Sequence, residues 1–73
     1  MTPLSMAKIG EAGYIRKIAG QDRVRLRLAE IGFVAGECVK VVAEMDGSMI
    51  LNVKGTRVAL NKAMAGRIFV CGI

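Results

Sequence analysis

The chain has 73 residues, of which 53% are hydrophobic and only three are aromatic. This length excludes a two-domain protein, so we expect one domain over 1–73 with a core of aliphatic side chains. The net charge of +5 suits an acidic partner but does not distinguish an acidic protein surface from a nucleic acid.

The first half of the chain predicts a strand followed by a helix. The segment 14–18 is rich in β-prone residues, but Ile15 and Ile18 are three residues apart and cannot share a face of a regular strand, which predicts a bulge or a bend. A helix is predicted over 21–31 because Val24, Leu28 and Ile31 recur at helical spacing. Asp22 stands at its start as N-cap or first-turn acid, and Gly32 ends it.

The second half predicts strands joined by tight turns. Residues 37–45 and 48–54 alternate in hydropathy, and Asp46-Gly47 between them is a strong hairpin signal. A turn is predicted at Gly55-Thr56, followed by a strand over 57–60, one helical turn over 61–66 capped by Asn61, and a last strand around 68–70. The inward positions are predicted to be Val39, Val41, Ala43, Met49, Leu51, Val53, Val58, Leu60, Ile68 and Val70. About five short strands with one inserted helix favour a mainly β fold closed into a small barrel.

The residues that usually carry chemistry are scarce. The chain has no histidine, the commonest general base and metal ligand, and it has no phosphate-cradling glycine motif. We therefore expect no enzyme and no cofactor. Cys38 and Cys71 are predicted to be reduced thiols, and they are weak candidate ligands for an iron or zinc ion together with nearby acids, since they form no close pair.

Charge is unevenly distributed along the chain. Basic residues concentrate in 14–27 and 54–67, whereas acids concentrate in 30–46. One interpretation is a small-barrel module that binds nucleic acid through the two basic segments. Three scattered aromatic residues are a poor platform for stacking bases, which disfavours that alternative.

Apolar side chains outside the predicted core favour a protein partner or a homo-oligomer instead. Leu26 lies off the helical stripe, Phe69 and Cys71 are on the outward phase of the last strand, and Met64 is in the connecting turn. No uncharged stretch exceeds seven residues, and no secretory signal pattern opens the chain. We therefore expect a cytoplasmic protein without a membrane-spanning helix.

Three runs together resemble the FeoA family. They are Arg27-Leu28-Ala29-Glu30-Ile31-Gly32-Phe33-Val34-Ala35-Gly36, Gly55-Thr56-Arg57-Val58-Ala59-Leu60 and Ala65-Gly66-Arg67-Ile68-Phe69-Val70. The resemblance covers nearly the whole chain. The chain departs from the family pattern at Ala35 and Ser48-Met49, where proline is frequent, and at Asn61, where a basic residue is common.

The resemblance implies an SH3-like barrel and an accessory role in bacterial ferrous iron uptake. Its implied partner is the cytoplasmic, GTPase-bearing part of the FeoB membrane transporter, and the family role also allows association with a transition metal ion. The same fold occurs as the C-terminal domain of metal-dependent repressors. We accordingly predict a non-enzymatic adaptor whose contact surface includes Arg23, Leu26, Arg27 and Met64.

Overall fold

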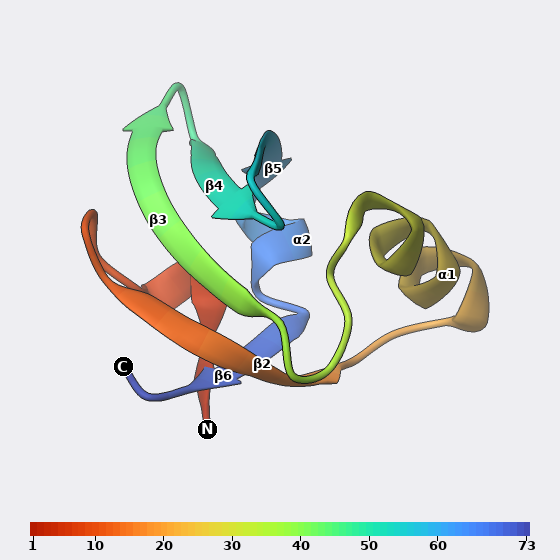
Figure 1. Cartoon of the computed structure of the whole chain (residues 1–73). Coiled ribbons are helices and arrows are strands. Elements are labelled where there is room, and N and C mark those ends of the chain that lie inside the picture. Colours follow the sequence, from red (N-terminus) through yellow and green to blue (C-terminus); the bar gives the residue numbers. More distant parts are fainter.

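The computed structural model describes residues 1–73 and is built around one antiparallel sheet (Figure 1). The strands are β1 (Thr2–Pro3), β2 (Ala12–Ile18), β3 (Cys38–Met45), β4 (Ser48–Val53), β5 (Thr56–Asn61) and β6 (Ile68–Cys71), in the spatial order β1-β6-β2-β3-β4-β5. The helices are the 3-10 turn η1 (Leu4–Met6), α1 (Asp22–Ile31) and α2 (Lys62–Ala65). The predicted mainly β fold with an inserted helix is confirmed, and the two-residue β1 is an additional strand.

Two irregularities interrupt the register of the sheet. The pairing of β2 with β6 shifts between Ile15 and Lys17, which confirms the bulge or bend expected in 14–18. The pairing of β3 with β4 shifts between Val41 and Ala43. Such irregularities bend a strand and increase its twist, so they help this sheet to wrap around a single core.

Two hairpins have two-residue turns in which both residues have positive φ angles. Asp46 and Gly47 have φ angles of 50° and 79°, as a type I′ turn requires, and they confirm the predicted hairpin. The next turn consists of Lys54 and Gly55, with φ angles of 51° and 74°. The expected turn at Gly55-Thr56 is therefore wrong by one residue, because Thr56 already pairs with Val53 at the start of β5.

Fourteen buried hydrophobic side chains form the core inside the sheet. They are Leu4, Ala7, Ile15, Leu28, Phe33, Val39, Val41, Met49, Leu51, Val53, Leu60, Ala65, Ile68 and Val70. Ala43 is half-buried beyond the β3 irregularity, and Val58 packs against the cluster from β5. Most of the predicted inward positions are therefore confirmed.

Helix α1 meets this core through fewer residues than its apolar spacing predicts. Leu28 is buried and Val24 packs against the core, but Ile31 is 38% exposed, so its predicted place on the buried stripe is wrong. The helix ends directly after Ile31 at Gly32, whose φ of 125° turns the chain away. No helix of the structure is both long and apolar enough to span a membrane.

Candidate functional site

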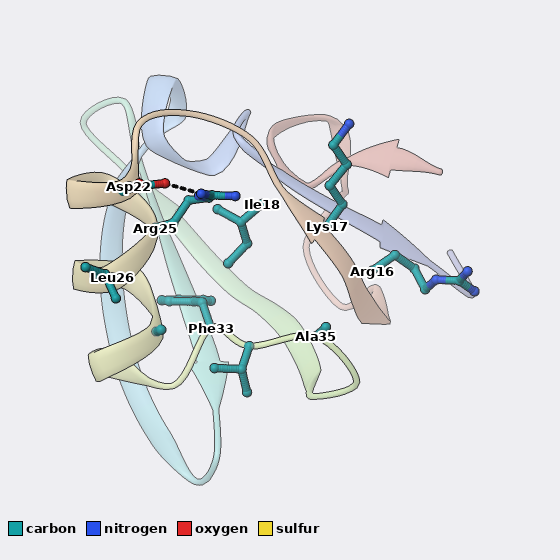
Figure 2. A pocket seen from close by; sticks show the side chains of 10 residues that line it. Arg16, Lys17, Ile18, Asp22, Arg25, Leu26, Phe33 and Ala35 are labelled. Atoms are coloured by element: carbon teal, nitrogen blue, oxygen red, sulfur yellow. Dashed lines mark hydrogen bonds and ion pairs between the residues drawn. The ribbon is translucent and has the colours of Figure 1, made fainter.

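A groove of about 600 Å³ lies between α1, the second half of β2 and the segment that follows α1. It is lined by Arg16, Lys17, Ile18, Asp22, Arg25, Leu26, Ala29, Phe33, Val34 and Ala35. Figure 2 shows Ile18 and Phe33 between the helix and the strand, with Arg16 and Lys17 across from the helix.

The helical repeat explains why α1 supplies one wall of this groove. Asp22, Arg25, Leu26 and Ala29 are spaced three or four residues apart and therefore share a face of the helix. The neighbouring face carries Leu28 into the core. One short helix thus serves two apolar surfaces, one buried and one open.

Backbone hydrogen bonds fix the segment after α1 against β2. The Gly32 and Phe33 amides donate to the Leu28 carbonyl at 3.2 and 2.9 Å and end the helix. The Gly36 amide donates to the Ile15 carbonyl at 2.7 Å, and the Ile15 amide donates to the Glu37 carbonyl at 2.9 Å. These bonds hold the 33–35 segment between helix and strand, where Phe33 is fully buried.

The groove combines an apolar interior with a basic rim. Arg25 donates from Nη2 to Asp22 Oδ1 on the same helix, and this ion pair neutralises much of the charge at that end (Figure 2). Arg16 and Lys17 form no ion pair in the structure and are exposed. A segment that carries both an apolar and an acidic side chain therefore fits this surface best.

Three of the four predicted contact residues, Arg23, Leu26 and Arg27, share a face of α1, whereas Met64 lies on another element. Leu26 lines the groove and is 64% exposed. Arg23 and Arg27 are exposed on α1 but do not line the groove. Met64 lies on α2, where it is half-buried and packs against the core, so it is not a freely exposed contact residue.

Several groove residues are missing from the sequence-based prediction. Arg16 and Lys17 belong to the basic segment 14–27, but the sequence does not reveal which of its members lie together. The apolar run 33–35, bracketed by Gly32 and Gly36, is a signal for a constrained apolar segment.

The two cysteines lie on either side of one tyrosine. Tyr14 on β2 pairs with Cys38 on β3 and with Cys71 on β6. Two strand spacings separate the cysteine Cα atoms by about 10 Å, too far for a disulfide, and both thiols are free. Sulfur ligands of one ion lie about 4 Å apart, so this pair with Tyr14 between its members does not form a common metal site. The structure contains no group of three or more histidine, cysteine or acidic residues placed to hold a metal ion.

Comparison with known proteins finds similarity over almost the whole chain. Residues 2–71 match the model of the FeoA domain. A protein of Methanocaldococcus jannaschii named "Putative Fe(2+) transport protein A" is 33% identical over 70 residues, which cover 96% of this chain and 85% of the relative.

Solved structures agree with this match. A crystal structure described as iron uptake regulatory protein (FeoA) has a TM-score of 0.88 at 34% identity, covering 96% of this chain and 93% of its own. FeoA of Stenotrophomonas maltophilia, complexed with zinc and described as a prokaryotic SH3 domain protein, has a TM-score of 0.85 at 28% identity, with 97% and 91% covered. A manganese-dependent transcriptional repressor shares the fold at 22% identity over 41% of its length, with a TM-score of 0.86.

Proposed function

The chain belongs to the FeoA family, and from this premise we propose that it is a non-enzymatic accessory protein of ferrous iron uptake. Its partner is the cytoplasmic, GTPase-bearing part of a FeoB-type transporter, which it modulates by contact. The protein acts in the cytoplasm, where that part of the transporter lies.

The groove beside α1 is the observation that carries this proposal. It offers Leu26 and a buried apolar floor to a partner, with Arg16 and Lys17 available for acidic groups. Its volume of about 600 Å³ suits a few side chains of a peptide segment. A contact of this size is weak and reversible, as expected for an adaptor that tunes a transporter.

The chemistry of the lining supports a binding role over a catalytic one. The only acid in the groove, Asp22, is paired with Arg25, and the groove contains no histidine, cysteine or serine. A general base or nucleophile with an orienting partner is what catalysis would need there.

Titration of the labelled protein with the soluble cytoplasmic domain of the transporter tests the proposal, with and without guanine nucleotide. The variant Leu26→Asp places an unpaired carboxylate on the groove wall and is expected to weaken binding by about tenfold or more. The matched control is Met45→Asp, because Met45 is 62% exposed, close to the 64% of Leu26, but lies on β3 outside the groove. No binding of the unmodified protein at high micromolar concentration, or equal losses in both variants, would overturn the proposal.

A further inference from the structure

Basic side chains gather at the end of the molecule that carries α1. Six of them lie on α1 or on the strand and turn segments beside it, namely Arg16, Lys17, Arg23, Arg25, Arg27 and Arg67. Arg67 belongs to this group because its guanidinium lies over Gly20, directly before α1. The acids on the helix are only Asp22, which is paired with Arg25, and Glu30.

Acidic side chains lie at the far side of the barrel. Asp46 is at the tip of the β3–β4 hairpin beside Glu44, which is paired with Lys62, and this hairpin stands on the opposite side of the molecule from α1 (Figure 1). The protein therefore has an electric polarity along the line that joins these two features. In front of a negatively charged surface, this polarity turns α1 toward the surface.

The basic end also carries an exposed apolar side chain. Leu26 lies about 160° around the helix from Leu28, the residue that anchors α1 in the core, and it is 64% exposed. Arg23 and Arg27 lie on one flank of Leu26, and Arg25 lies on the other. Asp22 and Glu30 lie closer to Leu26 around the helix, at four residues on either side, and Asp22 is paired with Arg25. This face of α1 thus offers one apolar side chain to insert and arginines to contact phosphates, two features of helices that lie in the interface of a membrane.

We propose that this end of the molecule binds the anionic surface of a phospholipid membrane. The arginines contact headgroup phosphates, and Leu26 enters the boundary between headgroups and acyl chains. Basic residues near such a surface give attraction that ordinary salt weakens, so binding is reversible. This inference goes beyond the proposed function, because it needs no transporter and uses Arg23 and Arg27, which do not line the groove.

A lipid surface explains this end better than a nucleic acid does. Nucleic-acid phosphates would match the arginines but leave Leu26 without an apolar environment. The second basic segment contributes Arg67 to the patch but forms no continuous free polycation, because Lys54 lies 3.7 Å from Glu37 and Lys62 lies 3.6 Å from Glu44. The exposed aromatic side chain is Tyr14, which lies among the cysteines of β3 and β6 and not on α1.

Co-sedimentation with vesicles tests the proposal on the full chain. Vesicles of phosphatidylcholine with about one third phosphatidylglycerol are compared with pure phosphatidylcholine, at about 0.05 M and about 0.3 M salt. Binding is expected only to the anionic vesicles and mainly at low salt. Inorganic phosphate at matched ionic strength is expected not to compete.

Two variants locate the contact. Arg23→Gln with Arg27→Gln is expected to weaken vesicle binding by about 25-fold, from about fivefold for each basic residue near the surface. The control is Lys40→Gln with Arg57→Gln, which removes the same charge from exposed residues on either side of Asn52 on the outer face of the sheet. It is expected to lose no more than about threefold, because neither residue lies on α1. Leu26→Ser is expected to weaken binding several-fold without changing net charge.

Four outcomes would overturn the proposal. They are equal binding to neutral and anionic vesicles, equal losses of vesicle binding in the two double variants, and unchanged vesicle binding of Leu26→Ser. The fourth is tighter binding to an oligonucleotide than to anionic vesicles at the same phosphate concentration. Far-UV circular dichroism of each variant confirms that it is folded. Titration of the unmodified protein with the soluble transporter domain contains no lipid, and the vesicles contain no transporter, so the two proposals fail separately.

Discussion

Leu26 and Leu28 are two positions apart on α1 and lie in opposite environments: Leu28 is 1% exposed and Leu26 is 64% exposed. The helix has 3.6 residues per turn, so side chains two positions apart point about 160° away from each other. The same side chain therefore has a structural role at position 28 and is free for recognition at position 26.

Replacement of each leucine by alanine separates these roles. Leu28→Ala removes buried methyl groups and leaves a cavity, so it is expected to lower the free energy of unfolding by about 2–5 kcal/mol. Leu26→Ala removes a surface side chain and is expected to change it by less than about 0.5 kcal/mol. Urea unfolding followed by circular dichroism measures both, and similar losses in the two variants would contradict the assignment of the buried face.

The sheet and its core follow largely from the sequence because each depends on a local pattern. Alternation places Met49, Leu51 and Val53 on one face of β4, and all three are buried. The spacing of Ile15 and Ile18 reveals the irregularity in β2 before the structure does. β1 is not foreseeable in the same way, because two residues that pair with Val70 and Phe69 form no pattern of their own.

The groove follows from the sequence only in part. The mismatch of Leu26 with the apolar stripe identifies it as a surface residue, and the structure places it on the groove wall. Its companions Arg16 and Phe33 come from segments on either side of α1, and they meet because hydrogen bonds tie 36–37 to Ile15. No periodic pattern in the sequence predicts this contact, because it joins residues that precede α1 in the chain with residues that follow it.

Gly13 is expected to tolerate no side chain. A Cβ at this position of β2 would lie 2.7 Å from the Cys71 carbonyl oxygen and 2.8 Å from Ile73 Cγ1. The first contact involves the backbone of β6, so Gly13→Ala must push apart two paired strands. We expect a loss of about 1–3 kcal/mol, as for other overpacked sites.

Gly66→Ala is the control for this substitution. Gly66 has a φ of −66°, and a Cβ there would have its nearest neighbour at 3.3 Å. We expect a change below about 1 kcal/mol, because the backbone conformation suits any residue. Thermal unfolding compares the variants, and equal stability of Gly13→Ala and the unmodified chain would refute the close contact between β2 and β6.

Asn61 caps the short helix α2. Its side-chain oxygen accepts a hydrogen bond from the Met64 amide at 2.8 Å, as the sequence position predicts. Asn61→Ala is expected to cost about 1 kcal/mol, which lowers the unfolding temperature of a domain of this size by about 4–8 °C. Asn61→Asp keeps the accepting oxygen and is expected to retain most of the stability; if both variants melt alike, the cap contributes nothing.

Oxidation is expected to leave the two thiols of each molecule unlinked to each other. Cys38 and Cys71 are separated by Tyr14 across two strand spacings, and a disulfide between them would require the sheet to open. After treatment of a dilute sample with a mild oxidant, a thiol reagent should still titrate two free thiols per molecule. Mass spectrometry excludes mixed adducts of the oxidant with either cysteine. Cys38 is exposed and Cys71 is half-buried, so Cys38 should react first, and the single variants Cys38→Ser and Cys71→Ser assign the two rates. A mass loss of about two hydrogens in the monomer would show that the cysteines reach each other and would contradict the order β6-β2-β3.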